Sequence, residues 1–228
     1  MTASKSPHRT VGRKHADLAP RTARAGDLSD LDWLTFFRDM YIGFGPSDDL
    51  VRRCIRRAYR DFNRTWPMGA CSEQERAVVR TAGENLLAQG LDDLRAYDVD
   101  QAAFDAWHAA LCKKLMRATR NARGGGGLTL GQAQKWINMT VKYAVGGRVL
   151  GLERFEHVAH VPIDRILLKE LATLPGFEVA LAHLPPGAWS KLADVGAYEA
   201  FQCAVRDRVA PKSPLSLEFS LWLKSQNG

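Results

Sequence analysis

Apolar side chains recur every three or four residues along most of the chain, which is the spacing of amphipathic helices. The first such segment begins at Ser29, a helix-capping residue, and stops at the sequence GFGP in positions 43–46. Only 176–187, which ends in a proline pair, is expected to be extended. Helices joined by short loops predict an all-α fold. Further helices are predicted over 48–66, from Ser72 onward, over 101–122 and about 130–145, after Pro162, and near 195–208 and 213–225.

The composition is that of a globular protein. The 228 residues are 46% hydrophobic and 25% charged, which allows a sizeable core and excludes wholesale disorder. No apolar run approaches the roughly 20 residues of a membrane helix, so we expect no membrane partner. The four cysteines form no CxxC pair, which is typical of reduced thiols in a cytoplasmic protein and predicts no metal site.

The charge balance favours a polyanionic partner. The chain has 32 Lys and Arg against 25 Asp and Glu, a formal net charge of +7. Residues 1–26 contain basic side chains throughout and a single acid, Asp17, and are expected to form a disordered arm. Such an arm adds attraction for phosphates or is simply a solubilising tail. Residues 27–228 are predicted to form a single all-helical domain.

Residues 124–132 form the first candidate site. Four glycines at 124–127 precede Thr129 and Gln132, whose spacing predicts a capping box with Thr129 as the N-cap. The free amides of the first helical turn, with Gly131 permitting a close backbone approach, could bind one phosphate. A flexible linker followed by an ordinary helix is the alternative.

The same helix has a row of polar residues. Lys135, Asn138 and Lys142 are spaced to lie on one face, with Ile137 and Val141 on the opposite one. The helix dipole disfavours a cation in the second turn, which favours a neutral, nucleophilic amine on Lys135. Alternatively, both lysines simply face water.

Downstream, Val161-Pro162-Ile163-Asp164 precedes another helix, with Asp164 expected in its first turn, where a carboxylate is stabilising in any case. Together with Gly131-Gln-Ala-Gln-Lys135, this segment resembles the helix-hairpin-helix DNA glycosylases, in which a Gly-x-Gly-x-Lys hairpin and a later V-P-V-D each open a helix. The two lysines seven residues apart are most similar to the 8-oxoguanine branch, including its archaeal-type members. The resemblance covers residues 124–171. Ala133 stands in place of the second hairpin glycine, and the four-cysteine cluster of the endonuclease III branch is missing.

The resemblance implies a two-lobed helical bundle that binds a flipped, damaged nucleotide between its lobes. By position, Lys135 would attack the sugar C1′, expel the base and form a Schiff base, and Asp164 would stay ionised and stabilise positive charge on the sugar. The implied protein is a monomeric DNA glycosylase/lyase that excises an oxidised purine such as 8-oxoguanine from double-stranded DNA. It would need no cofactor and would be cytoplasmic and associated with the nucleoid.

Hairpin residues are expected to hold a phosphate beside the lesion, and arginines before the glycines either grip the DNA backbone or form a solvated helix face. His157 and His160 lack further metal ligands, so we expect a loop contact. Phe219 and Trp222 are expected to pack or to close the base pocket. The DNA-binding candidates are Gly127, Thr129, Gly131, Gln132, Arg117, Arg120 and Arg123.

Two other functions fit the same sequence. One is a catalytically inactive helix-hairpin-helix protein that binds nucleic acid, and the other is a helical module whose basic patches bind an acidic protein. The glycosylase and the inactive binder differ in whether Lys135 and Asp164 face one pocket.

Overall fold

The computed structural model describes residues 29–46, 49–66, 71–96, 98–120 and 127–226. Every regular element in this part of the chain is helical, which confirms the predicted all-α fold. The predicted basic arm, residues 1–26, lies outside the described residues. The elements are α1 (Asp30–Phe36), the π-helical η1 (Phe37–Ile42), α2 (Leu50–Phe62), η3 (Asn63–Thr65), α3 (Glu73–Arg95), α4 (Gln101–Thr119), α5 (Leu130–Gly146), η4 (Glu153–His157), α6 (Arg165–Leu171), α7 (Glu178–Ala182), η5 (Trp189–Lys191), α8 (Val195–Val209) and α9 (Pro214–Gln226).

Local capping sets several of these helix starts. Ser29, Ser72 and Thr129 each form a capping box with the residue three positions later, which confirms the capping box predicted for Thr129. The prediction of an extended segment over 176–187 is wrong, because α7 lies inside it. Phe177 and Ala180 are buried three residues apart, so the helical spacing of apolar positions prevails over the proline pair that follows.

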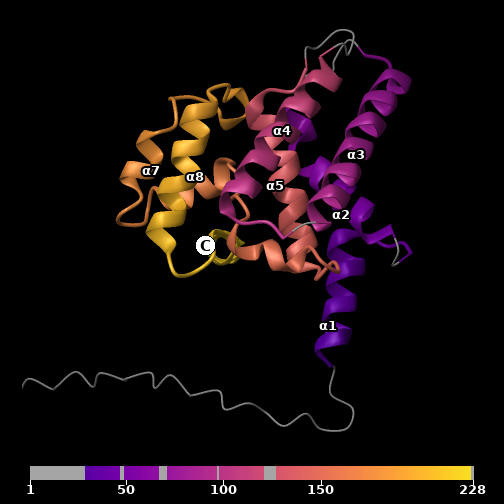
Figure 1. The fold of residues 1–228 in the computed structure, drawn as a ribbon, viewed down its shortest axis with the longest axis horizontal. Coiled ribbons are helices and arrows are strands. Elements are labelled where there is room, and N and C mark those ends of the chain that lie inside the picture. The colour runs from indigo at the N-terminus through magenta and orange to yellow at the C-terminus, as the bar shows by residue number, and fades with distance from the viewer. Residues whose placement is uncertain (1–28, 47–48, 67–70, 97, 121–126, 227–228) are drawn as a thin grey trace, which may run out of the picture.

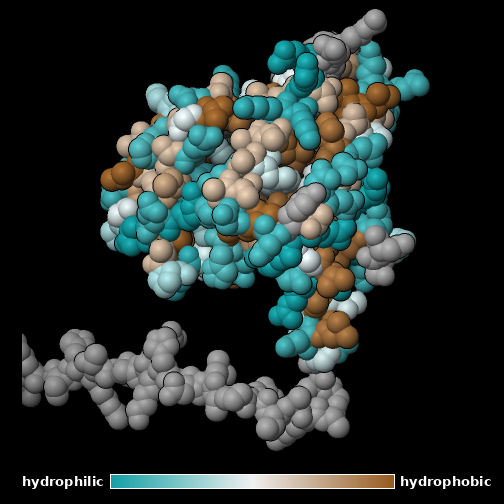
Figure 2. Space-filling model, viewed as in Figure 1, coloured by the Kyte–Doolittle hydropathy of each residue, from teal (hydrophilic) through white to brown (hydrophobic). Residues whose placement is uncertain are grey.

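Helix α5 runs through the middle of the molecule, with α2 and α3 on one side and α7 and α8 on the other (Figure 1). Every residue from Leu130 to Val145 is buried, so this helix lies in the interior of the molecule. By contrast, α1 projects from the body and leaves apolar side chains in solvent, as Figure 2 shows. Trp33 is 57% exposed and Phe36 is 58% exposed. No helix within the described ranges is long and apolar enough to cross a bilayer.

Trp136 fixes the packing of α5 against its neighbours. Its ring is fully buried, and its indole N–H donates to the carbonyl oxygen of Ile55 in α2 at 3.0 Å. The far edge of the ring lies against Gly83 of α3, where an added Cβ would come within 2.5 Å of two ring carbons. A glycine is therefore needed at position 83 for this close approach.

Substituting Gly83→Ala should lower the free energy of unfolding by about 1–3 kcal/mol, because the indole cannot move away from an added methyl group. The matched control is Gly196→Ala in α8, where the nearest atom to an added Cβ is an Asp194 carboxylate oxygen at 3.4 Å. That control should be neutral or stabilising by up to about 1 kcal/mol, because alanine favours the helix. Urea unfolding followed by circular dichroism measures both, and equal effects would contradict this account of the α3–α5 contact.

Candidate functional site

A cleft of about 630 Å³ opens beside α5. Its lining includes Lys135, Met139 and Lys142 from α5, Asp164 from the start of α6, and Trp222 from α9. The cleft is larger than three other cavities among the described residues, of about 290, 110 and 90 Å³, and lies within the size range of small-ligand sites.

Lys135 and Asp164 are in direct contact in this cleft. The Nζ atom of Lys135 donates to Oδ2 of Asp164, and the lysine is 3% exposed. The other carboxylate oxygen, Oδ1, accepts from the backbone N–H of Leu167 at 2.8 Å, which makes Asp164 the N-cap of α6. Asp164 therefore lies one residue before the helix and not in its first turn. A single carboxylate both caps α6 and faces the buried amine.

A second buried ion pair lies further along the cleft. Nζ of Lys142 is 2.5 Å from Oε2 of Glu218 in α9, and the two side chains are 2% and 7% exposed. Burial lowers the pKa of Lys142 and raises the pKa of Glu218, and their mutual attraction only partly offsets this. The amine also lies 4.7 Å from the ring centroid of Phe219 and 5.7 Å from that of Trp222.

The predicted polar face of α5 needs one correction. Lys135 and Lys142 line the cleft, but Asn138 does not, and Met139 takes that place. Asn138 is 1% exposed and donates to the carbonyl oxygen of Val161 at 3.1 Å, on the other side of the helix. The alternative that both lysines simply face water is also wrong, because both are buried.

The first turn of α5 is closed to a phosphate, contrary to the prediction. The Gly131 N–H donates to the carbonyl oxygen of Leu192 at 2.9 Å. The Thr129 hydroxyl donates to Ser190 O at 2.6 Å, and the Gln132 side-chain amide donates to Thr65 O at 2.6 Å. The close approach expected at Gly131 exists, but its partner is η5, because an added Cβ would lie 2.0 Å from the carbonyl oxygen of Trp189.

Three of the remaining DNA-binding candidates, Gly127, Arg117 and Arg120, do not line the cleft. Gly127 packs against the end of α4, where an added Cβ would come within 2.9 Å of the Arg120 backbone. Arg117 and Arg120 are exposed on α4 and do not line the cleft, and Arg123 lies outside the described residues. Three other exposed arginines line the cleft instead: Arg60, Arg64 and Arg165.

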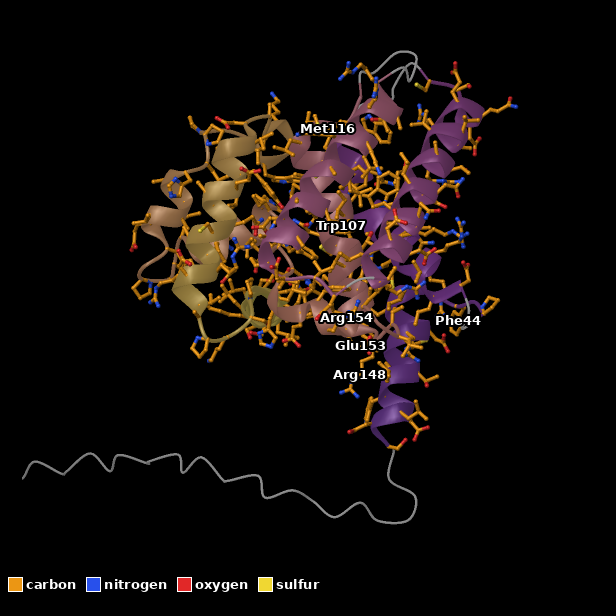
Figure 3. The ribbon with its side chains drawn as sticks, in the orientation of Figure 1. Phe44, Trp107, Met116, Arg148, Glu153 and Arg154 are labelled. Carbon is orange, nitrogen blue, oxygen red and sulfur yellow. The ribbon has the colours of Figure 1, made fainter. Side chains whose placement is uncertain are left out.

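A smaller cavity of about 110 Å³ lies between α4 and α8, and Met116, labelled in Figure 3, forms part of its wall. His160 contacts the Tyr198 hydroxyl through Nδ1 at 2.8 Å and Asp105 through Nε2 at 2.7 Å. The Tyr198 hydroxyl is also 3.2 Å from Nε2 of His108. Burial lowers the pKa of both histidines, whereas hydrogen bonds from His160 and Gln101 lower the pKa of Asp105 to about 2 against the opposing effect of burial. The histidines are therefore neutral beside an ionised carboxylate.

Sequence reasoning missed Glu218 and Trp189, which both line the cleft. Glu218 had a detectable signal, because it is the single acid in the apolar segment 214–223 and lies four residues before Trp222, on the same helical face. Trp189 had no such signal. It sits in a short 3₁₀ turn whose position depends on contacts with α5.

Comparison of the chain with family models, with curated proteins and with solved structures finds no match in any of the three. The function is therefore inferred from the site itself. The site joins a buried amine and a carboxylate to a second buried ion pair and aromatic walls, with arginines along the same cleft.

Substituting Asp164→Asn should lower the free energy of unfolding by about 2–3 kcal/mol, because it leaves the buried Lys135 ammonium without its counter-charge. The control is Asp194→Asn in α8. Asp194 also caps its helix, accepting from Ala197 N at 3.0 Å, but forms no ion pair within the described chain. Asparagine caps helices nearly as well as aspartate, so the control should cost well under about 1 kcal/mol. Equal losses in urea unfolding would show that Asp164 acts only as a cap.

Stability should decrease as the pH falls from 7 to 5. In the folded protein burial holds the pKa values of His108 and His160 below 6.5, so the unfolded chain takes up protons on these residues at a higher pH than the folded protein does. Each histidine should contribute a decrease of at most about 1.4 kcal/mol per pH unit below its unfolded pKa. Urea unfolding at both pH values measures this decrease. The His108→Gln variant should show a smaller decrease than wild type, and a stability unchanged between pH 7 and 5 would contradict the lowered pKa values of the two histidines.

Proposed function

We propose that this protein is a DNA glycosylase/lyase that removes an oxidised purine, such as 8-oxoguanine, through a Schiff base on Lys135. The observation that supports this most is the contact between Lys135 and Asp164 inside a cleft of about 630 Å³. The two residues come from segments 29 positions apart in the chain. An inactive nucleic-acid-binding protein would not need a buried amine and a carboxylate facing the same cavity.

The reaction assigned to Lys135 is nucleophilic substitution at the sugar. The Nζ lone pair forms a bond to C1′ while the glycosidic bond breaks, and the departing base takes up a proton lost from Nζ. The sugar ring then opens, O4′ takes a proton from solvent, and an iminium remains on the lysine. Loss of a C2′ proton eliminates the 3′ phosphate. The ionised Asp164, already beside Nζ, stabilises the positive charge that develops on the sugar and on the nitrogen.

The second ion pair and the aromatic side chains are suited to hold the flipped base. Trp222 and Tyr41 supply flat apolar surface in the cleft, with their ring centroids 5.9 Å apart. Lys142 offers hydrogen-bond donors and Glu218 offers acceptors, both buried, so an extruded base would exchange water for these groups. We assign Lys142 and Glu218 to reading the base and Lys135 to the sugar.

Double-stranded DNA would approach over the arginines that line the cleft. Arg60 and Arg64 come from the end of α2 and η3, and Arg165 opens α6 next to Asp164. Arginine side chains on both sides of the cleft would hold the phosphates that flank the flipped nucleotide. In this proposal the protein acts as a monomer, and the two groups of helices beside α5 are the lobes of a helix-hairpin-helix glycosylase core.

Borohydride trapping on two DNA duplexes tests the assignment. One duplex contains 8-oxoguanine, and the other contains a preformed abasic site, which needs no base removal. Wild type should form a covalent adduct with both. Lys135→Gln, which keeps a hydrogen-bonding group beside Asp164, should form neither. The matched variant Lys142→Gln should still form the adduct with the abasic duplex, but its rate of adduct formation with the 8-oxoguanine duplex should fall at least tenfold.

Two outcomes would contradict the proposal. Adduct formation by Lys135→Gln at the wild-type level would remove Lys135 as the nucleophile. Binding of both duplexes by wild type with no adduct on either would favour the inactive nucleic-acid-binding protein. Circular dichroism of each variant confirms that it is folded before the comparison is made.

A further inference from the structure

The side chain of Gln134 is joined to the backbone of the residue before Asp164. Its Oε1 accepts from the Ile163 N–H at 3.1 Å, and its Nε2 donates to the Ile163 carbonyl oxygen at 2.9 Å. The same Nε2 also donates to Gly131 O at 2.9 Å, within its own helix. Gln134 has no exposed surface, so water does not compete for these bonds.

A second glutamine holds the same segment in the same way. Oε1 of Gln202 in α8 accepts from the Val161 N–H at 3.0 Å, and its Nε2 donates to Val161 O at 2.9 Å. Asn138 links the two sites, because its Nδ2 lies 3.0 Å from Oε1 of Gln134 and 3.1 Å from Val161 O. The alternate residues Val161 and Ile163 are each held at both backbone groups by one buried side-chain amide.

The two glutamines differ in their relation to the site. Gln134 is the chain neighbour of Lys135, and its side chain grips the chain neighbour of Asp164. A change in the position of Ile163 therefore passes directly to the Asp164 carboxylate. Gln202, on α8, binds the backbone of Val161, three residues before Asp164. Neither Gln202 nor a residue next to it in the chain lines the cleft.

We propose that Gln134 is a positioning residue that sets the distance and orientation between the Lys135 amine and the Asp164 carboxylate. Its hydrogen bonds join the backbone of Gly131, four residues before Lys135, to the backbone of Ile163, which directly precedes Asp164. The assignment rests on the proposed function for its catalytic meaning. That Gln134 holds the Lys135 amine and the Asp164 carboxylate together is inferred from the hydrogen bonds alone.

Gln134→Met and Gln202→Met form a matched pair for the test. Each removes the two hydrogen bonds to one buried backbone residue and keeps nearly the same side-chain volume. Gln134→Met also loses the bonds to Gly131 O and Asn138 Nδ2, so it should lower the midpoint of urea unfolding more than Gln202→Met does. A merely structural role predicts that the two folded variants do not differ in the reactivity of Lys135. Gln134→Glu is a milder variant that keeps the acceptor for the Ile163 N–H.

The first readout uses the protein without DNA. Formaldehyde condenses with a free amine to an imine and water, and cyanoborohydride hydride reduces the imine to a methylamine. Mass spectrometry measures the rate at Lys135 at pH 7.5. Loosening the contact with Asp164 makes the unprotonated amine more available, so Gln134→Met should react at least threefold faster than wild type. The methylation rate of Gln134→Glu should lie between those of wild type and Gln134→Met, and the rate of Gln202→Met should stay within twofold of wild type.

The second readout is trapping on the abasic duplex. Gln134→Met should trap at least tenfold more slowly at saturating DNA, with an unchanged Kd for the duplex, whereas Gln202→Met should stay within threefold of wild type. Equal methylation rates for Gln134→Met and Gln202→Met would overturn the positioning role. If Gln134→Met does not fold, a wild-type methylation rate for Gln134→Glu would overturn it. Absence of a wild-type adduct would refute the proposed function, while the methylation rates would still decide the role of Gln134.

Discussion

The complete burial of α5 is the constraint on which the rest of the structure depends. A helix buried along its whole length leaves little water for its polar side chains, so each of them needs a hydrogen-bonding or ionic partner within the protein. Lys135 pairs with Asp164, Lys142 pairs with Glu218, and Asn138 donates to the backbone carbonyl oxygen of Val161. These pairings join α5 to α6, to α9 and to the segment before α6.

Burying two lysines is costly, and hydrophobic residues of similar volume often give equal or greater stability at such positions. Both ion pairs here line the same cleft, where a ligand can reach them. Residues elsewhere in α5, such as Trp136 and Ile137, fill the core without charge. The charged groups are therefore confined to the one side of α5 that opens to the cleft, which is the distribution expected of a site and not of a device for stability.

Local signals in the sequence were sufficient for the starts of α1, α3 and α5, because a capping box such as Thr129 with Gln132 depends only on neighbours three residues apart. The resemblance to glycosylases implied only that Lys135 and Asp164 face one pocket, and in the fold the two side chains are in direct contact. The partner of Gly131 could not be predicted, since a glycine that permits close approach does not specify what approaches. The direction of Asn138 likewise depended on Val161 and Tyr198, which only the tertiary structure brings together.

The central claim is that Lys135 is the nucleophile and that its neighbour in the same cleft, Lys142, is not. The most direct measurement is mass-spectrometric location of the sugar remnant on wild-type protein that has been reduced with borohydride on an 8-oxoguanine duplex and digested. We expect a single modified peptide with the remnant on Lys135. A remnant on Lys142, or on the exposed lysines Lys113 and Lys114 of α4, would contradict it.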